Sequence, residues 1–344
     1  MPDLALADRL RAVGRAAGLD ALGFAEATPF TRTRDDLVER KAAGLHGGMQ
    51  FTYRDPERST DPGRILPGAR TLVVGARSYR RVPPEHDDGP PAARVAAYAW
   101  RDHYADLRAA LTRVAEALEA EGHRARVVLD DNALVDREAA VRAGLGWYGR
   151  NSTVLLPDQG SEFVLGSVVT DADLPPADAP VPDGCGPCHR CQDACPTGAL
   201  VAPGVLDARR CLAWLVQAPG DFPEDLREAL GDRIYGCDDC QDVCPVNRRA
   251  ATAGVVPEAE ADVEDQVDLL GLLAADDEEL LAAHGRWYIP RRDPRYLRRN
   301  ALVALGNAAE PGDARALAVL DRYAEGDDDL LARHARWARE QLVS

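Results

Sequence analysis

Apolar residues in the first half of the chain follow two kinds of spacing. Recurrence every three or four residues, as on one face of a helix, occurs at 5–17, 107–118 and 137–143. Short apolar runs typical of buried strands occur at 21–25, 71–76, 126–129, 153–156 and 163–169. Because helices and strands alternate, residues 1–173 are predicted to form an N-terminal α/β domain.

The pattern changes after residue 173. Residues 174–182 are rich in proline and are typical of a linker. A cysteine-rich segment follows, and an acidic, alanine-rich stretch at 250–268 then leads into helical patterns at 278–284, 295–308, 312–324 and 328–342. The sequence therefore predicts a multidomain α+β protein with domains at 1–173, 174–249 and 250–344.

The C-terminal helices allow two interpretations. Two antiparallel helices within roughly 40 residues have the size of one HEAT-type repeat. A plain helical cap on the preceding domain is the alternative. A single clear pair of helices does not separate the two.

The formal net charge of −16 argues, taken alone, against a nucleic-acid partner, because phosphate binding depends on Lys and Arg side chains. Residues 286–299 depart from that balance, with six arginines, one aspartate and interleaved aromatic residues. This stripe is either the entry of an arginine-rich helix or a phosphate-binding patch. The candidate phosphate contacts are Arg291, Arg292, Arg295, Arg298 and Arg299.

The N-terminal residues mix acidic, basic and apolar side chains, unlike a signal peptide or a twin-arginine leader. No stretch approaches the roughly 18 apolar residues that a membrane-spanning helix requires. We therefore expect a cytoplasmic protein with no membrane partner. Since cytosolic thiols stay reduced, the eight cysteines are expected to bind metal or do redox work rather than form disulfides.

The first cysteine run has the spacing of bacterial-type ferredoxins. Cys185, Cys188, Cys191 and Cys195 form C-x2-C-x2-C-x3-C, followed by a proline. In that pattern the three closely spaced cysteines bind one [4Fe-4S] cluster, and the fourth cysteine binds a second cluster. A second cysteine run is therefore required.

Cys237, Cys240 and Cys244, again followed by proline, repeat the spacing, but Ile234 stands where the first cysteine of the run would be. Cys211 is the one cysteine left, and we assign it to that vacancy. Cluster 1 is then expected to be bound by Cys185, Cys188, Cys191 and Cys244, and cluster 2 by Cys195, Cys211, Cys237 and Cys240. Tetrahedral zinc is the alternative, although zinc sites do not ordinarily use this triple run.

Three further features could carry chemistry. Residues 144–149 match G-x-G-x-x-G, but they follow a helix and precede a strand, the reverse of a dinucleotide-binding turn. They predict either a tight turn or a loop that lets backbone approach a cofactor. Asp130, at a strand end, is a catalytic candidate or a turn residue. Asp102 and His103 are candidate substrate contacts or an ordinary helix start.

Several motifs together resemble those of the epoxyqueuosine reductase family. They are L-D-D-N-A-L-V-D-R at 129–137, A-G-L-G-W-Y-G-R-N at 143–151 and I-Y-G-C-D-D-C at 234–240, with both cysteine runs. The resemblance covers most of the chain. The segment at 300–307 is also similar to the HEAT-like C-terminal part of longer members, which implies a tRNA-contacting role for residues 250–344.

The resemblance implies a cobalamin-dependent enzyme that reduces the epoxide of epoxyqueuosine, at the wobble position of tRNA, to give queuosine. The tRNA partner would carry a queuosine-type anticodon. An external one-electron donor of flavodoxin or ferredoxin type would reduce the two [4Fe-4S] clusters, which would pass electrons to cobalamin. Nothing in the sequence demands more than a monomer.

The resemblance also implies roles for single residues. Asp130 falls at the family's general-acid position, where burial beside the corrin would raise its pKa and keep it protonated near neutrality. Arg137 falls at the position of the arginine near the lower face of cobalt. The residues expected to line the corrin of the N-terminal cobalamin-binding domain are Val154, Leu165 and a strand near Ala96 and Tyr98.

The chain departs from the family pattern around these positions. Asp102, His103 and Tyr104 stand where the family usually has Asp-Tyr-His, so the histidine expected near the substrate is displaced by one residue. The usual proline, glutamate and lysine are replaced by Ala133, Asp136 and Arg150. These departures bear on the substrate contacts more than on the clusters.

Two other functions fit part of these features. A cobalamin and iron–sulfur reductase of a small molecule, like the reductive dehalogenases, has a similar cofactor set but normally carries a twin-arginine leader. A non-catalytic electron carrier would not need so large an N-terminal domain. The arginine stripe favours tRNA as the substrate, because it lies where the helical C-terminal segment begins.

Overall fold

A four-stranded sheet forms the centre of the N-terminal part of the molecule. The computed structural model describes residues 2–86, 89–254, 256–257 and 263–343. The sheet has the order β1-β2-β7-β4, and every neighbouring pair is antiparallel. Its strands are β1 (Ala21–Glu26), β2 (Thr71–Ser78), β4 (Ala125–Val128) and β7 (Phe163–Thr170).

This pairing corrects the α/β class predicted for residues 1–173. An α/β domain has parallel strands joined by helices, whereas this sheet is antiparallel throughout and belongs to an α+β arrangement. The mixture of helices and strands is confirmed. Apolar spacing predicts where strands occur, but it does not encode the direction in which they pair.

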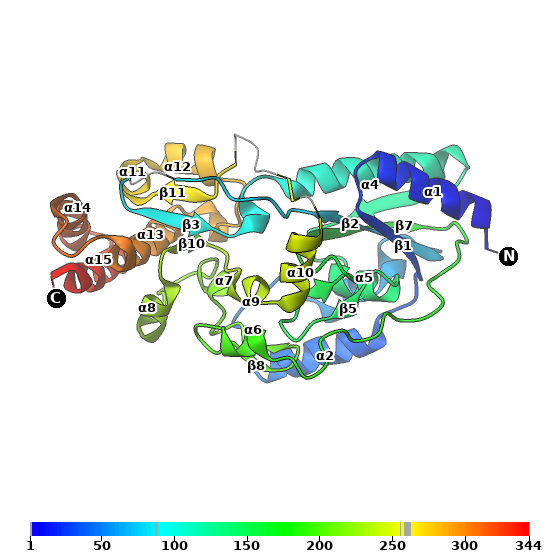
Figure 1. Ribbon diagram of the computed structural model, residues 1–344, viewed down its shortest axis with the longest axis horizontal. Helices are drawn as coiled ribbons and strands as arrows, with labels where there is room; N and C mark the ends of the chain where they lie inside the picture. The colour runs from blue at the N-terminus through cyan, green and yellow to red at the C-terminus, as the bar shows by residue number, and fades with distance from the viewer. Residues whose placement is uncertain (1, 87–88, 255, 258–262, 344) are drawn as a thin grey trace.

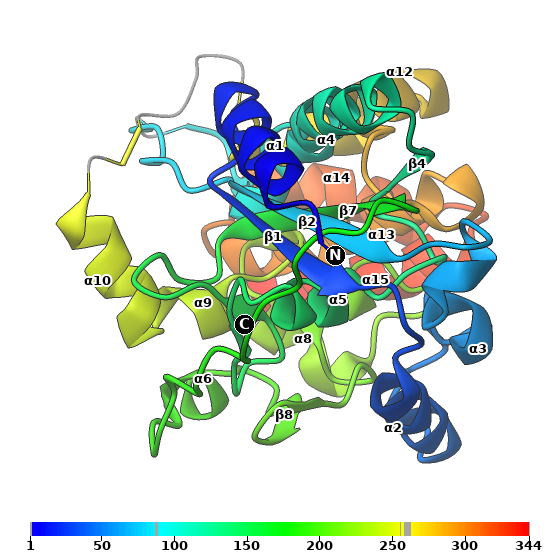
Figure 2. The same cartoon turned by 90° about the vertical axis from the view of Figure 1, so that its right-hand side faces the viewer.

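Helices cover both faces of this sheet. α1 (Leu4–Ala16) and α4 (His103–Ala120) lie on one face, and α5 (Asp136–Arg142) lies on the other (Figure 2). Leu10 of α1 and Leu107 of α4 are fully buried in the core on their side. The apolar stripes predicted from the sequence are therefore the faces that these helices pack against the sheet.

A second sheet joins segments from all three predicted domains. Its order is β10-β3-β11, with β10 parallel and β11 antiparallel to β3. The strands are β3 (Ala92–Val95), β10 (Arg233–Tyr235) and β11 (Gln266–Asp268). The predicted domains thus share this sheet, and one continuous core extends from it into the C-terminal helices.

The segment after β3 corrects another expectation. The strand predicted near Ala96 and Tyr98 ends at Val95, and a 3₁₀ turn, η2 (Ala97–Ala99), follows it. The carboxylate of Asp238 accepts the N–H of Ala97 at 2.7 Å. A carboxylate far away in the sequence therefore stabilises the turn, and the local pattern contains no sign of it.

The cysteine-rich segment is built from short elements and loops, and it lies between the N-terminal sheet and the C-terminal helices (Figure 1). Its elements are α6 (Arg190–Asp193), β8 (Leu200–Ala202), β9 (Val205–Leu206), α7 (Leu212–Leu215), α8 (Arg227–Leu230), α9 (Asp239–Asp242) and α10 (Pro245–Ala253). α6 contains Cys191 and α9 contains Cys240, the aligned cysteines of the two runs. These two helices contact each other, which brings the two runs together.

The C-terminal part is helical, as the sequence predicts. Its helices are α11 (Leu269–Ala274), α12 (Asp277–His284), α13 (Arg295–Ala308), α14 (Ala314–Ala324) and α15 (Asp329–Val343). α15 packs against both α13 and α14 (Figure 1). α13 and α15 approach closely at Gly306, where a Cβ atom would lie 2.7 Å from the Cα of Ala338. The HEAT-like character of this part stays a prediction.

Shorter elements connect these parts. They are α2 (Thr31–Ala42), α3 (Pro56–Ser59), β5 (Trp147–Tyr148), β6 (Val154–Leu155) and the 3₁₀ turns η1 (Pro62–Arg64), η3 (Glu224–Leu226) and η4 (Pro290–Arg292). Part of the acidic stretch at 250–268 lies outside the described residues. Among the described helices, none combines the length and the apolar character needed to cross a lipid bilayer.

The position of Arg299 corrects the prediction that it contacts phosphate. Its side chain is 0% exposed. Nη1 donates to the carbonyls of Ala218 and Gly220, both at 2.7 Å, and Nη2 donates to the carbonyl of Leu215 at 2.9 Å. Burial lowers the pKa of Arg299 to about 10, which still leaves it charged at neutral pH. The guanidinium therefore ties the loop after α7 to the C-terminal helices.

Arg299→Ala is expected to lower the free energy of unfolding by about 3 kcal/mol, because several buried carbonyls would lose their donor. Urea unfolding followed by circular dichroism measures this change. The control is Arg291→Ala, at an exposed position of the same stretch, which should change stability by less than about 0.5 kcal/mol. Equal unfolding midpoints for the two variants would contradict the structural role of Arg299.

Candidate functional site

Four cysteines border one cavity of about 230 Å³. Its lining includes Cys185, Cys188, Cys191 and Cys244, together with Arg150, Leu155, Val246 and Arg249. The indole N–H of Trp147 donates to Sγ of Cys185 at 3.4 Å. The structure thus brings Cys244 from the second run to three cysteines of the first, the set assigned to cluster 1.

The other four cysteines lie together in more buried surroundings. Burial is the main cause that raises the pKa of Cys211 and of Cys240, and the charge of a neighbouring thiol adds to each shift. For Cys211 that neighbour is Cys195, and for Cys240 the neighbours include Cys237 and Cys211. Burial also raises the pKa of Cys237 to about 12. Cys211 therefore lies beside the cysteines with which it is predicted to bind cluster 2.

The donor sets fit iron–sulfur clusters. All eight cysteines belong to the described residues and carry free thiols. Two groups of four cysteines are the ligand set that two [4Fe-4S] clusters require. A tetrahedral zinc site would draw four sulfurs to roughly 2.3 Å from one ion, whereas four of these cysteines border a cavity. The arrangement favours the larger cluster over a single ion.

Asp130 follows β4 in an unusual backbone conformation. Its φ is 47°, in the left-handed region that aspartate enters more readily than most residues. Desolvation raises the pKa of Asp130; the charge of Arg108 opposes the shift, and those of Asp102 and Asp131 add to it. The residue is exposed to solvent, which limits the size of the shift. Its carboxyl thus keeps a proton to a higher pH than an ordinary aspartate.

Asp136, the first residue of α5, places a second carboxyl near Asp130. Desolvation raises the pKa of Asp136 well above its ordinary value, and the charge of Asp130 adds to the shift. Among the described residues, its buried Oδ1 has no hydrogen-bond partner. Because a buried polar atom without a partner is costly, this atom marks a place where a polar ligand would be stabilised.

Polar groups surround Arg137. Its Nη1 donates to the carbonyl of Ser152 at 3.1 Å. Burial raises the pKa of Tyr53, Tyr104 and Tyr148, and in each case the charge of Arg137 opposes the shift, which places three phenols near one guanidinium. The buried Oγ of Ser152, like Asp136 Oδ1, has no hydrogen-bond partner in the described part of the chain. This surface can bind a large polar group.

The residues predicted to line a corrin differ in accessibility. Tyr98 and Leu165 are partly exposed, whereas Ala96 and Val154 are 6% and 4% exposed, with Val154 packed in the core against α5. The ring of Tyr98 lies 6.2 Å from that of Tyr235, centroid to centroid. A Cβ atom at Gly236 would lie 2.3 Å from Cβ of Ala96. The loop that carries Cys237 therefore packs directly on the turn that carries Tyr98.

His103 faces away from Asp130 and Arg137. It is 2% exposed, and its ring lies 5.9 Å from that of Tyr79. Burial, followed by the charge of Arg101, lowers the pKa of His103 to about 4, so the ring is neutral at pH 7. The expectation that His103 contacts the substrate is therefore wrong in this structure.

Tyr104 is a site residue that the sequence reasoning missed. Burial raises its pKa, and the charges of Asp130 and Asp136 add to the shift, so its hydroxyl is near both carboxyls. Because a helix turns about 100° per residue, adjacent positions at the start of α4 face different surroundings. Asp102 is the N-cap of that helix and accepts the N–H of Ala105 at 2.9 Å. Tyr104 stands at the position where the family usually has its histidine. That position could have identified Tyr104 as a site residue, although the residue type differs.

Residues 144–149 form a tight helix-to-strand turn, one of the two alternatives that the sequence allows. A Cβ atom at Gly146 would lie 2.1 Å from the carbonyl oxygen of Leu155. At Gly149 a Cβ atom would lie 2.2 Å from Cδ1 of the same leucine. The glycines therefore allow β5 to pair closely with β6.

The arginine-rich stretch has an exposed part next to the second sheet. Tyr288 is 58% exposed, and its backbone N–H donates to the hydroxyl of Tyr235 at 2.8 Å. Arg291 and Arg292 are exposed and have φ values of 56° and 54°. An exposed aromatic ring beside two arginines is suited to single-stranded RNA, which binds by base stacking and phosphate contacts.

Two other arginines of the stretch are engaged within the protein. Arg295 pairs with Asp293 at 2.6 Å. Arg298 pairs with Asp277 and donates to the carbonyl of Ala275 at 2.8 Å. Arg292 donates through Nη1 to the carbonyl of Gly285 at 3.1 Å but has no carboxylate partner among the described residues. Arg291 and Arg292 are therefore more available to a phosphate than Arg295 and Arg298.

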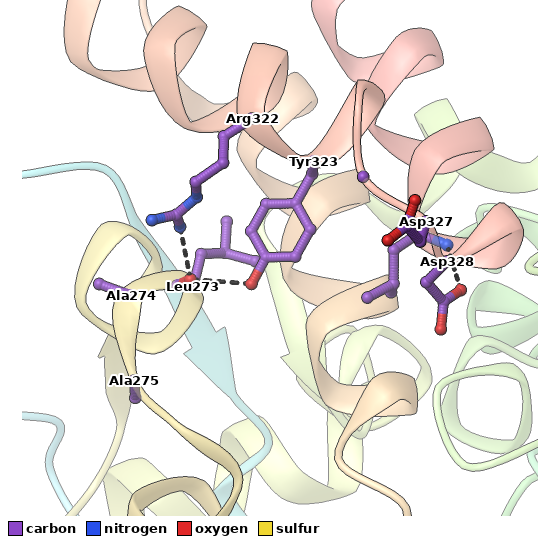
Figure 3. A pocket seen from close by; sticks show the side chains of 9 residues that line it. Leu273, Ala274, Ala275, Arg322, Tyr323, Asp327 and Asp328 are labelled. Carbon is purple, nitrogen blue, oxygen red and sulfur yellow. Dashed lines mark hydrogen bonds between the residues drawn. The ribbon is translucent and has the colours of Figure 1, made fainter.

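A larger cavity, of about 360 Å³, lies between α11, α14 and α15 (Figure 3). Nη2 of Arg322 and the hydroxyl of Tyr323 both donate to the carbonyl of Leu273 at 2.8 Å. These polar groups are thus satisfied inside the protein, and the wall also carries Asp327 and Asp328. The cavity is remote from the cysteines, and we place the functional site at the cysteines and Arg137 in spite of its larger size.

Comparisons with known proteins match the cysteine-rich segment and part of the N-terminal region. The family profile described as "4Fe-4S double cluster binding domain" matches residues 184–247. The profile described as "Epoxyqueuosine reductase QueG, DUF1730" matches residues 59–131. The first match spans all eight cysteines, and the second ends next to Asp130.

Curated relatives named epoxyqueuosine reductase are similar over nearly the whole chain. The relative from Xanthomonas campestris is 36% identical over 349 residues, covering 97% of this chain and 96% of the relative. The relative from Burkholderia pseudomallei is 35% identical over 386 residues, covering 97% and 91%. The relative from Bacillus cereus is 34% identical over 340 residues, covering 95% and 86%.

Solved structures of the same name have the same fold. A crystal structure of epoxyqueuosine reductase with a tRNA-Tyr epoxyqueuosine-modified stem loop has a TM-score of 0.89 and 30% identity, covering 99% of this chain and 91% of that chain. A Bacillus subtilis structure, in which a catalytic aspartate loop is swung out of the active site, has a TM-score of 0.87 with the same identity and coverage.

Cys211→Ala is expected to remove cluster 2 and leave cluster 1, so the iron content should fall by half. Iron analysis and visible absorption of anaerobically purified protein measure this. The control is Thr197→Ser, which keeps the hydroxyl that lies 3.8 Å from Sγ of Cys195 and should keep both clusters. Full iron content in Cys211→Ala would exclude Cys211 as a ligand.

Proposed function

The chain belongs to the epoxyqueuosine reductase family, and we propose that it reduces the epoxide of epoxyqueuosine in tRNA to queuosine at the site around Asp130 and Arg137. Arg137 acts electrostatically both on Cys211, a predicted cluster 2 ligand, and on Asp136, whose carboxyl lies near Asp130. This proximity of a cluster ligand to two carboxyls with raised pKa values carries the proposal. Converting the epoxide to an alkene and water takes two electrons and two protons. The site has groups suited to supplying both.

The cluster segment supplies the electrons. Its matched family profile describes a double 4Fe-4S domain, so the chain carries two such clusters. The charge of Cys191, a proposed ligand of cluster 1, contributes to the raised pKa of Cys240, a proposed ligand of cluster 2. The charge of Arg137 also acts on Cys211. Cluster 2 would therefore lie between cluster 1 and the site, and electrons would pass in that order.

The residues around Arg137 fit a cobalamin. The corrin ring carries amide side chains, which can satisfy the buried polar atoms Asp136 Oδ1 and Ser152 Oγ. We assign Arg137, Ala96, Tyr98, Val154 and Leu165 to this binding surface. When bound, cobalamin would supply a strongly nucleophilic cobalt of low potential. These residues would hold it near Asp130 and near the loop that carries Cys237.

Asp130 would donate a proton to the departing oxygen. Its raised pKa favours the protonated form, and a bound cofactor and tRNA would exclude water and strengthen that preference. Asp130 belongs to the loop between β4 and α5. The swung-out aspartate loop of the Bacillus subtilis relative supports a loop that closes over the substrate. Asp102 and Tyr104, near the same carboxyl, would contact the nucleoside.

The exposed surface of Tyr288, Arg291 and Arg292 would bind the anticodon loop. Its arginines can contact phosphates, and the tyrosine ring can stack on a base. The Tyr288 N–H donates to Tyr235, and the ring of Tyr235 lies near Tyr98, so this surface adjoins the cobalamin surface. Arg295 and Arg298 would contact phosphate by exchanging their carboxylate partners, Asp293 and Asp277, for it. The relative solved with a tRNA stem loop supports a tRNA with a queuosine-type anticodon as partner.

Two other functions leave part of the structure without a role. A small-molecule reductase would have no use for the Tyr288 surface, and an electron carrier would have no use for the carboxyls at Arg137.

We further propose that the protein acts in the cytoplasm as a monomer and takes electrons from a flavodoxin or ferredoxin.

Asp130→Asn is expected to abolish turnover of epoxyqueuosine-modified tRNA, because the amide cannot donate the carboxyl proton. Cobalamin and cluster spectra should stay unchanged. Product nucleosides are measured by mass spectrometry after digestion. The matched control is Asp131→Asn, the exposed neighbour, which should keep most activity. In the unchanged enzyme the rate should fall as pH rises through the raised pKa of Asp130, since the proton donor is then lost. Full activity of Asp130→Asn would remove Asp130 from the mechanism.

The variant Tyr288→Ala/Arg291→Glu is expected to raise KM for the modified tRNA by about tenfold or more, through loss of stacking and of a phosphate contact. kcat at saturating tRNA should change little. Steady-state kinetics at two salt concentrations measure both. Arg315→Glu, an exposed residue of α14, is the charge-matched control. Equal KM values for the two variants would exclude the Tyr288 surface.

A further inference from the structure

The two cluster sites differ in their access to solvent. Around cluster 1, the cysteines alternate with exposed residues, among them Gly184, Gly186 and Pro187. At Gly186 an added Cβ atom would meet nothing within 4 Å, so no other part of the protein covers the chain on that side. Around cluster 2, the neighbours Leu212 and Tyr235 are buried. Cluster 1 is therefore the cluster that an outside molecule can approach.

Arginines surround the cavity of cluster 1. Arg150 and Arg249 line it, while Arg190 and Arg248 are exposed on the helices α6 and α10 that flank it. In the described part of the chain, no acidic side chain pairs with any of these four guanidinium groups; Arg248 donates to the carbonyl of Asp242 at 2.8 Å. We call this set, Arg150, Arg190, Arg248 and Arg249, the cluster 1 rim.

The acidic groups near the rim are partly engaged elsewhere. Asp193 pairs with His189 at 2.6 Å. Asp183 accepts the N–H of Cys185 at 2.8 Å. Asp242 is exposed and remains as a nearby negative charge. The four arginines of the rim thus outnumber these three aspartates, an excess of positive charge on a chain whose formal net charge is −16.

We propose that the cluster 1 rim is the docking face for a small, acidic one-electron carrier protein of flavodoxin type. This inference rests on the proposed function, since it concerns how electrons enter the clusters. Opposite charges steer such encounters and raise association rates by about 10- to 1000-fold at low salt. The overall negative charge would repel an acidic carrier elsewhere, so the rim also selects where it docks. α6 and α10 both contact α9, and all three lie along one side of the molecule (Figure 2).

The proposed step balances without a further reactant. The anionic flavin hydroquinone of the carrier loses one electron and becomes the neutral semiquinone. The oxidised cluster gains that electron, from [4Fe-4S]²⁺ to [4Fe-4S]⁺, and no proton moves. Exposed glycines beside the cysteines let the edge of a flavin come near the cluster, and electron transfer slows steeply with distance.

The test is the rate at which photoreduced flavodoxin bleaches the cluster absorption of the holoprotein in an anaerobic stopped-flow instrument. Arg248→Glu/Arg249→Glu is expected to lower the second-order rate at least tenfold at low ionic strength. The difference should shrink at high salt, because screening weakens the attraction. Arg113→Glu/Arg126→Glu, which reverses two exposed charges on α4 and β4, is the matched control and should react like the unchanged protein.

A second reductant distinguishes a variant that docks flavodoxin poorly from a variant whose cluster is damaged. Methyl viologen radical is a cation, so it should reduce Arg248→Glu/Arg249→Glu at least as fast as the unchanged protein. An unchanged flavodoxin rate, or equal slowing with both reductants at full iron content, would overturn the proposal. Because the measurement uses no tRNA, a failure of epoxide reduction would leave its outcome readable.

Discussion

The pairing of β3 with β10 and β11 is the constraint on which the rest of the structure depends. Ile234 of β10 is fully buried in the core of this sheet, at the position where the second cysteine run would otherwise begin. A strand that must pair with β3 and bury its side chain cannot also direct a thiolate to a cluster. Cys211, at the start of α7, lies beside the three remaining cysteines instead. The same sheet holds the cluster 2 loop against the turn of Ala96 and Tyr98.

This packing explains the electrostatics of the site. Residues between the two sheets lose solvent, so the pKa values of thiols, phenols and carboxyls rise together, while Arg137 opposes the shifts of those nearest to it. Asp136 and Ser152 keep buried polar atoms without partners in the described part of the chain. A protein tolerates such atoms where a ligand will satisfy them. Asp130 is exposed and in a left-handed conformation, and we propose that its carboxyl meets the substrate.

The sequence predicted elements well where local spacing decides the structure. The helices α4, α13 and α15 and the strands β1, β2 and β7 lie close to their predicted ranges. The prediction from sequence was wrong where a contact between residues far apart in the chain decides the local structure. Asp238 stabilises a 3₁₀ turn at Ala97–Ala99, where a strand was predicted to continue. The four strands of the N-terminal sheet pair antiparallel, a direction that apolar spacing does not encode. The sequence suggested that Arg299 is a surface residue. In the structure it is buried and donates to backbone carbonyls in and after α7. His103 and Tyr104 are neighbours in the first turn of α4, but their side chains have different surroundings. His103 packs beside Tyr79, whereas Tyr104 lies near Asp130 and Asp136.

We propose that electrons entering at the cysteines leave through the surface around Arg137 and Asp130 to reduce an epoxide on tRNA. The most direct measurement is to incubate the reduced holoprotein, loaded with cobalamin, with a tRNA stem loop bearing epoxyqueuosine, and to weigh the modified nucleoside by mass spectrometry. We expect the loss of one oxygen atom, giving queuosine. A nucleoside of unchanged mass, from protein whose clusters and cobalamin are shown to be reduced, would contradict it.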